Sequence, residues 1–173
     1  MSQFTVREAI AGDRPMILNL LREHWGGESI VVRETVFRPA DLPTFVAVDG
    51  GENLVGFIAY TIEPTGCEVM VLESLIEGRG VGSALLAQVE RQASASGLES
   101  VSLMTTNDNI DALRFYLRRG YRITSVSLGA VDRARLMKPS ITLVASNGIP
   151  IHDELTLVKE LDGADGADSG ETP

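Results

Sequence analysis

The residues with the clearest chemical potential form a glycine-rich turn at 77–83, which reads Glu-Gly-Arg-Gly-Val-Gly-Ser. It follows an apolar, strand-like stretch, and a helical pattern begins at Val81. Backbone N–H groups at a helix start point into one concavity, where the helix dipole adds positive potential. Gly78, Gly80 and Gly82 allow a ligand to approach closely, because they carry no Cβ. The turn therefore predicts a phosphate cradle built from backbone amides.

Two well-known phosphate-binding turns fit this segment poorly. A P-loop ends in Gly-Lys-Ser or Gly-Lys-Thr, whereas Gly82 is followed directly by Ser83. A Rossmann turn needs a third small residue and an acid about 20 residues later. Starting from Gly80, that third position is Leu85, and the strand-like segment that follows ends in Thr-Thr-Asn at 105–107. A plain tight strand-to-helix turn also fits, so the turn alone leaves its ligand open.

A second motif lies about one helix and one strand later. Residues 109–116 follow the pattern Asn-x-x-Ala-x-x-Phe-Tyr, and Gly-Tyr follows at 120–121. Together with Gly-Val-Gly at 80–82 and Leu-Leu at 85–86, this motif resembles the GNAT superfamily of acyl-CoA-dependent N-acyltransferases. The resemblance spans about residues 44–128, and the run at 138–154 is similar to a bacterial branch of the superfamily.

The resemblance implies an α/β fold with a GNAT-type mixed, mostly antiparallel central sheet, splayed in the middle and flanked by helices. The hydrophobic pattern independently predicts a mixed sheet with helices, because strands and helices alternate after an antiparallel run. The expected strands are 4–7, 44–48, 54–62, 67–75, 101–104, 121–128 and 154–158, and the expected helices are 13–24, with Asp13 as its cap, 81–94 and 109–119.

Acetyl-CoA is the co-substrate that the resemblance implies. Its expected contacts come from the end of the strand before the glycines, from the turn and from the second motif. Those residues are Leu72, Ser74, Leu75, Gly78, Arg79, Gly80, Val81, Gly82, Ser83, Asn107, Asn109, Phe115 and Tyr116. Glu77 occupies a position where the superfamily usually has Gln or Arg, so we expect its side chain to turn outward and Arg79 to supply positive charge.

The implied reaction is direct attack of an amine on the thioester of acetyl-CoA. An alkyl ammonium has a pKa of about 10.4, so a base must remove a proton first. The thioester oxygen needs a fixed donor, expected from a backbone N–H at 72–74, and the departing thiolate needs a proton. Tyr116 is the candidate for this proton donor, because it matches a superfamily tyrosine that commonly lies near the thioester sulfur; the alternative is an ordinary aromatic residue of an apolar helix face. Asn109 is expected to touch the cofactor or to cap its helix.

Two glutamates on the strand before the turn are candidates for the base. Glu68 resembles the position that activates the amine in some superfamily members, and Glu73 lies closer to the acetyl end. Side chains alternate along a strand, so these two glutamates point to opposite faces unless a bulge intervenes. A partly exposed structural acid is an equally good interpretation of Glu68.

Other reactive side chains offer weaker alternatives. Cys67 would permit a ping-pong reaction through an acetyl-cysteine, but a small buried strand thiol is the more common case. His24, Trp25 and Arg33 lie where the acceptor-binding segment of the superfamily varies. His152, Asp153 and Glu154 come just before or at the start of the last expected strand and could present acids to a cationic amine, although a solvated loop is the more common case.

Composition limits the partners. The 173 residues include 24 acids against 15 Lys and Arg, a net charge of −9, with 44% apolar residues. This is a globular composition, and an acidic surface repels nucleic-acid phosphates and anionic membranes. We therefore expect a small-molecule or peptide amine acceptor, no nucleic acid, no membrane and a possible homodimer through the region after Leu128. Two histidines and one cysteine predict no metal site.

The charge pattern also suggests the domain boundaries. Residues 1–161 form the expected N-acetyltransferase domain, and 162–173, with four acids and no bulky apolar residue, form an expected flexible acidic tail. The first eight residues show no secretory pattern, and the single cysteine fits a reducing compartment, so a cytoplasmic location is expected. The main alternative function is an acyl-CoA-binding sensor or interaction module without turnover, and a Rossmann-type dinucleotide binder is the second.

Overall fold

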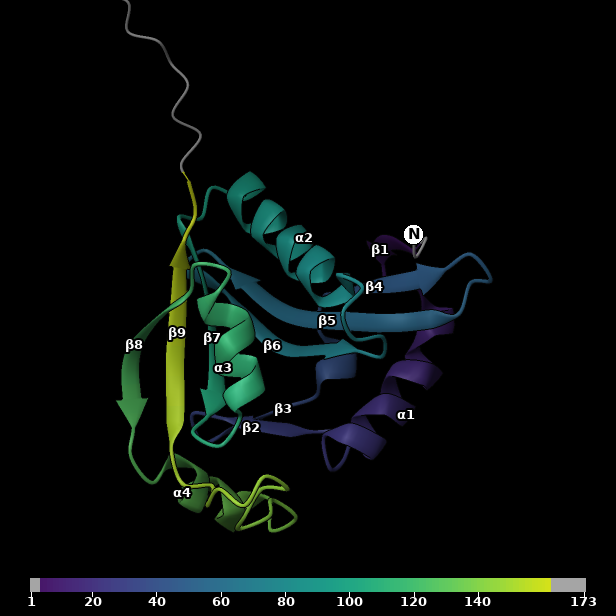
Figure 1. The fold of residues 1–173 in the computed structure, drawn as a ribbon. Helices are drawn as coiled ribbons and strands as arrows, with labels where there is room; N and C mark the ends of the chain where they lie inside the picture. Colours follow the sequence, from purple (N-terminus) through teal and green to yellow (C-terminus); the bar gives the residue numbers. More distant parts are fainter. Residues whose placement is uncertain (1–3, 163–173) are drawn as a thin grey trace, which may run out of the picture.

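The computed structural model describes residues 4–162, which form one seven-stranded mixed sheet, a separate two-stranded hairpin and four α-helices (Figure 1). The large sheet has the order β1-β4-β5-β6-β7-β9-β8, and β6–β7 is its parallel pair. Its strands are β1 (Phe4–Glu8), β4 (Thr44–Asp49), β5 (Leu54–Glu63), β6 (Gly66–Ser74), β7 (Ser100–Thr106), β8 (Arg122–Ser127) and β9 (Glu154–Glu160). The expected mixed, mostly antiparallel α/β architecture is confirmed.

The helices cover both faces of the sheet. They are α1 (Arg14–His24), α2 (Val81–Ala95), α3 (Ile110–Leu117) and α4 (Ala130–Met137), with short 3-10 turns at Ala11–Asp13 and Pro39–Asp41. Alternation along β4 separates two cores: Phe45 and Ala47 pack with α2, whereas Val46 and Val48 pack with α1. The sheet is therefore buried on two sides.

The sheet opens at its centre. Strand β6 pairs with β7 only from Cys67 to Val69, opposite Val101 to Leu103, and the two strands then diverge. In Figure 1, β4, β5 and β6 lie across the view, while β7 and β9 stand upright in it and point in opposite directions. Residues 71–74 of β6 remain paired with β5 on their other side. The opening leaves one edge of β6 without a strand partner among the described residues.

A β-bulge lies where β6 leaves β7. Tyr60 of β5 pairs with Val69 and Ala59 pairs with Val71, so Met70 has no partner across the ladder. The extra residue reverses the alternation of side chains beyond it. Val69 accordingly packs in the α2 core, whereas Met70 and Val71 both pack in the α1 core.

Two elements lie outside the sequence expectations. The hairpin of β2 (Ile30–Val32) and β3 (Thr35–Phe37) turns through Arg33 and Glu34, both with positive φ, at 48° and 59°. Helix α4 lies beside this hairpin, and Lys138 after it donates to the carbonyls of Trp25 (2.9 Å) and Ser29 (2.6 Å). Strand β2 of this hairpin lies along one side of the opening.

Asp13 occupies the N-cap position of α1, as expected, but its side chain does not cap the helix. The Asp13 carboxylate makes no cap hydrogen bond to α1 and instead accepts from the Ile10 N–H (2.7 Å) and from Arg7 (2.7 Å). The predicted tail falls almost wholly at 163–173, outside the described residues. Between residues 4 and 162, no helix is long and apolar enough to cross a membrane.

Candidate active site

A cavity of about 240 Å³ fills the opening of the sheet. Strand β6 and the end of β7 form its walls, α3 contributes Asn109, Ala112 and Tyr116, and β2 closes it. Trp25, after α1, and Glu154, at the start of β9, complete the wall. The predicted residues Leu72, Asn109 and Tyr116 therefore meet around one cavity.

The glycine-rich turn forms a second cavity at the end of β6. Its walls come from Ser74, from the turn at 76–83 and from Phe115 and Arg119, and its volume is about 450 Å³. Gly78 and Gly80 have φ of 70° and 79°, a left-handed conformation that other residues adopt at a cost. Helix α2 begins at Val81, so its first amides have no carbonyl partner within the helix. These are the amides for which the sequence predicts anion binding, and that binding stays a prediction.

The turn is packed against the second motif. A Cβ added to Gly82 would lie 3.3 Å from the Phe115 ring, so the lack of a side chain at 82 lets α3 approach α2. Glu77 is exposed and contributes to the cavity wall, and Arg79 lies between the two left-handed glycines. Leu75 is exposed, and its N–H donates to the Val55 carbonyl (2.9 Å).

Arg119 is a candidate functional residue that the motif analysis missed. Its guanidinium lies 3.6 Å from the Phe115 ring centroid and donates to the Ser83 hydroxyl (3.1 Å from Nε). It also lines the glycine-turn cavity, so a positive side chain stands beside the backbone amides. In the sequence, Arg119 indicates only the end of a helix. The contact with Ser83 joins residues 36 positions apart, so no local pattern could predict it.

Tyr116 lies between the two cavities and the core. It is 8% exposed, lines the central cavity and makes edge-on ring contacts with Phe115 (5.1 Å) and Tyr121 (5.6 Å). Burial raises the pKa of its phenol, and Arg119 opposes this shift. The hydroxyl therefore remains protonated throughout the physiological range. Asn109 caps α3 by accepting from the Ala112 N–H (3.2 Å), which confirms one of its two expected roles.

The bulge at Met70 brings Glu68 and Glu73 to the same face of β6. Glu73 accepts from Trp25 Nε1 (2.9 Å) and lies 3.1 Å from His24 Nδ1. Glu68 accepts from Arg33 of the hairpin (2.8 Å), and this hydrogen bond raises the pKa of the guanidinium. The other Glu68 oxygen, Oε1, is buried without a hydrogen-bond partner. Both glutamates are thus held by side chains from the end of α1 and from the β2–β3 hairpin.

Two further residues differ from their expected surroundings. Glu154 begins β9, as expected, but it is 7% exposed, so the solvated-loop interpretation is wrong for this residue. Asn107, predicted to bind the cofactor, directs its side chain to the segment before β9: its oxygen accepts from the backbone of His152 (2.9 Å) and Asp153 (3.0 Å). A cofactor contact of Asn107 stays a prediction.

Cys67 is poorly placed for covalent catalysis. It is 2% exposed, packs in the α2 core and has a pKa raised to about 11 by burial. A thiolate is the nucleophilic form of cysteine, so this environment suppresses the reactive species.

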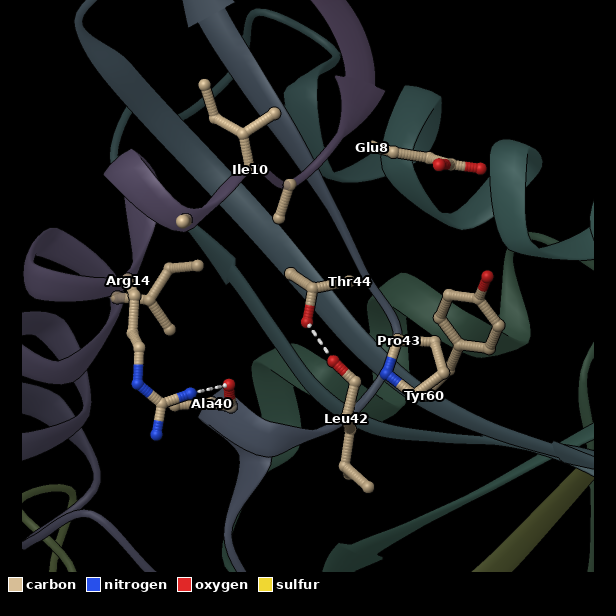
Figure 2. A pocket seen from close by; sticks show the side chains of 11 residues that line it. Glu8, Ile10, Arg14, Ala40, Leu42, Pro43, Thr44 and Tyr60 are labelled. Atoms are coloured by element: carbon tan, nitrogen blue, oxygen red, sulfur yellow. Dashed lines mark hydrogen bonds between the residues drawn. The ribbon is translucent and has the colours of Figure 1, made fainter.

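A third cavity, of about 390 Å³, lies between α1 and the start of β4 (Figure 2). Its charged wall residue Arg14 already donates to the Ala40 carbonyl and to Asp41, both at 2.5 Å. None of the predicted site residues lines it. In the part of the chain that the structure describes, no group of three His, Cys, Asp or Glu residues is arranged to hold a metal ion.

A mixed sheet opened beside a glycine-rich helix start is the architecture of the acetyltransferase class. Comparison with known proteins gives the same result, because residues 14–121 match the profile of the Acetyltransferase (GNAT) family. The chain belongs to the GNAT acetyltransferase family. It is 41% identical over 147 residues to the uncharacterized protein YdhI of Bacillus subtilis, covering 85% of this chain and 92% of that protein.

Solved structures share the fold at low sequence identity. An IAA acetyltransferase from Bacillus cereus is 21% identical with a TM-score of 0.69, over 92% of this chain and all (100%) of that one. A GNAT family acetyltransferase from Elizabethkingia anophelis, solved with acetyl-CoA bound, is 18% identical with a TM-score of 0.66, over 91% and 98% of the two chains.

Proposed function

We propose that the protein is an N-acetyltransferase that moves an acetyl group from acetyl-CoA to a primary amine by direct attack in a ternary complex. The observation that carries this proposal is the free edge of β6 at residues 70–74. It runs from the glycine-turn cavity to the cavity lined by Tyr116.

The residues present fit the parts of acetyl-CoA. The amides at the start of α2, with Arg119 beside them, suit the pyrophosphate. The free N–H and C=O groups of residues 70–74 suit the amides of the pantetheine arm, which pair as a neighbouring strand would. The Elizabethkingia structure supports this proposal, since that protein has the same fold and binds acetyl-CoA.

The chain supplies groups for both ends of the reacting thioester. A backbone N–H at residues 72–74, on the free edge, stabilises the charge that develops on the carbonyl oxygen. The Tyr116 hydroxyl donates a hydrogen bond to the leaving sulfur. Burial raises the pKa of Tyr116, whereas a thiol has a pKa of about 8.5. The phenol is therefore the weaker acid, and it does not give its own proton to the thiolate without receiving another. The proton that ends on sulfur therefore passes through Tyr116 from the amine nitrogen, which becomes acidic once the C–N bond has formed.

The side of the central cavity formed by Trp25, β2 and Glu154, here called the acceptor-facing side, favours a cationic amine. Trp25 and the hairpin residue Arg33 bond to Glu73 and Glu68, and Arg33 balances only one of these two charges. A small-molecule or peptide amine as partner, with no nucleic acid or membrane, remains part of this proposal, as does a cytoplasmic location. A homodimer also remains a proposal: Leu128 and Leu136, in the region concerned, are 74% and 85% exposed.

The test combines binding with turnover. Calorimetry should show tight binding of CoA and acetyl-CoA but not of NAD, and an amine panel should release free thiol from acetyl-CoA. Initial rates with both substrates varied should give intersecting lines, as a ternary complex requires, whereas parallel lines indicate a ping-pong reaction. Tight CoA binding without thiol release from any amine overturns the enzyme in favour of a sensor, and NAD binding in place of CoA favours the dinucleotide binder.

A further inference from the structure

Glu154 is the one charged residue that is buried among residues 4–162. It is the first residue of β9, where it pairs with Thr106 of β7 and with Ser127 of β8. A carboxyl group in such a place loses hydration, so folded proteins seldom bury one without a partner or a function.

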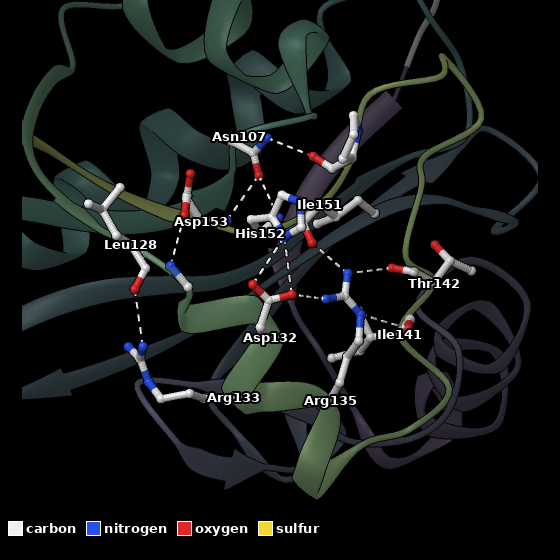
Figure 3. A network of polar contacts seen from close by, with 12 residues as sticks. Asn107, Leu128, Asp132, Arg133, Arg135, Ile141, Thr142, Ile151, His152 and Asp153 are labelled. Atoms are coloured by element: carbon white, nitrogen blue, oxygen red, sulfur yellow. Dashed lines mark hydrogen bonds and ion pairs between the residues drawn. The ribbon is translucent and has the colours of Figure 1, made fainter.

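A polar network fixes the chain just before Glu154 (Figure 3). Asn107, which follows β7, accepts from the N–H groups of His152 and Asp153, and its amide donates to the Pro150 carbonyl (2.9 Å). The Asp153 carboxylate in turn accepts from the Gly129 N–H (2.8 Å) at the start of α4. Glu154 is thus held on a rigid segment, which is what a catalytic group requires.

Glu154 is one of the residues that line the central cavity, together with Tyr116. The Arg33 backbone N–H donates to its carboxylate. The charged groups that act on it are Arg33 and Glu34 from the hairpin and Arg133 from α4. Burial raises the pKa of Glu154, the two arginines oppose this shift, and Glu34 reinforces it. A general base gains from a pKa moved toward the working pH.

The two glutamates of β6 are less available for proton transfer. Both oxygens of Glu73 have partners, His24 and Trp25. Arg33 holds one oxygen of Glu68, and the other is shielded from solvent. Neither Glu68 nor Glu73 is among the residues that line the central cavity, whereas Glu154 is.

We propose that Glu154 is the general base of this site and removes the proton of the acceptor ammonium. This assignment rests on the proposed acetyl transfer. The ammonium gives one proton to the Glu154 carboxylate, and its nitrogen lone pair then forms the C–N bond as the C–S bond breaks. The second nitrogen proton reaches sulfur through Tyr116, and Glu154 later releases its proton to water. The products are an amide and free CoA thiol.

The test compares Glu154→Gln with Glu68→Gln and Glu73→Gln on an amine that the wild type acetylates. Glu154→Gln should lower kcat about 10²- to 10⁴-fold and remove the acidic limb of the pH–kcat/KM profile, with acetyl-CoA affinity unchanged. Glu68→Gln and Glu73→Gln should keep that limb. Glu154→Asp, which restores a carboxyl group, should regain the limb at a reduced rate.

A second measurement needs no turnover, because it follows the titration of Glu154 in the wild-type protein. Carbon-13 NMR of glutamate carboxyls in the wild type should show Glu154, assigned by difference from Glu154→Gln or Glu154→Asp, titrating at higher pH than an ordinary glutamate. An ordinary titration, or an acidic limb that survives in Glu154→Gln and disappears in Glu68→Gln or Glu73→Gln, overturns the assignment alone. If the wild type acetylates no amine, the proposed function fails and the assignment fails with it.

Discussion

The two cavities of the proposed site are built from different groups. The glycine-turn cavity is the cofactor-facing side, and the wall of the central cavity formed by Trp25, β2 and Glu154 is the acceptor-facing side. On the cofactor-facing side, glycines and helix-start amides form the surface, and Arg119 lies beside them. On the acceptor-facing side, Trp25, strand β2 and Glu154 line the cavity, and His24 and Arg33 from the same part of the fold contact Glu73 and Glu68. The cofactor-facing side would bind its co-substrate mainly through backbone groups, which substitutions do not remove. The acceptor-facing side would bind the amine through side chains, which substitutions can change.

This division predicts that the two sides fail in different ways. Changes on the cofactor-facing side should weaken acetyl-CoA binding whatever the amine is. Changes on the acceptor-facing side should alter the KM or the pH dependence for the amine and leave acetyl-CoA binding intact. Tyr116 lies where the two sides meet, so it should affect neither binding constant strongly.

Among the variants that test this division, the largest effect on the rate is expected from Tyr116→Phe. Removing the hydroxyl takes away the donor to the leaving sulfur, so kcat should fall about 10²- to 10³-fold. Acetyl-CoA affinity, measured by calorimetry, should change less than about twofold, because the ring keeps its contacts with Phe115 and Tyr121. Unchanged turnover would remove Tyr116 from the reaction.

The next effect is expected from Arg119→Ala. The guanidinium packs on Phe115, bonds Ser83 and lines the glycine-turn cavity. Charged hydrogen bonds to phosphate are stronger than neutral ones, but partial exposure weakens them, so the Kd for acetyl-CoA should rise about tenfold. Arg118→Ala is the matched control, since Arg118 precedes it on the same helix end and does not line that cavity. Equal losses in both variants would mean that general positive charge, rather than the Ser83-linked position, holds the co-substrate.

The same contrast explains what the sequence could predict. The cradle, the α3 cap and Tyr116 depend on contacts within short segments or on glycine, so a local pattern identifies them. Gly80 begins α2 in a left-handed conformation, and Asn109 caps α3 within three residues. The same local periodicity predicts every strand of the large sheet and three of the four helices described.

The acceptor-facing side depends on contacts between distant parts of the chain. Glu73 meets Trp25 across 48 positions, Glu68 meets Arg33 across 35, and Asn107 meets Asp153 across 46. The bulge at Met70 decides which face of β6 Glu73 occupies. From the sequence, strand alternation indicated only that Glu68 and Glu73 need a bulge between them to share a face. The hairpin was missed because its turn uses Arg33 and Glu34 where Asn-Gly or Asp-Gly would be expected.

On the acceptor-facing side, Trp25→Phe should have a smaller effect. The substitution keeps an aromatic ring but removes the Nε1 donor to Glu73. Glu73 then keeps only His24 among the described residues, so its carboxylate is held less firmly. The kcat/KM for the amine should fall about fivefold while the Kd for acetyl-CoA stays constant. Tyr60→Phe, in the separate cavity of Figure 2, is the control and should change neither value; a rise in the acetyl-CoA Kd of Trp25→Phe would break the division.

The smallest effect on the rate is expected from Cys67→Ala, at the point where β6 and β7 still pair. Its thiol is 2% exposed and has a pKa raised to about 11, so it holds almost no thiolate at neutral pH. If the amine attacks the thioester directly, kcat should stay within about twofold, and only the melting temperature should fall, by about 2–4 °C for each kcal/mol of lost packing. Intact-mass spectrometry of wild type mixed with acetyl-CoA alone should show no acetylated protein. Loss of turnover in Cys67→Ala together with one added acetyl group on the wild type would replace the ternary complex with a ping-pong reaction.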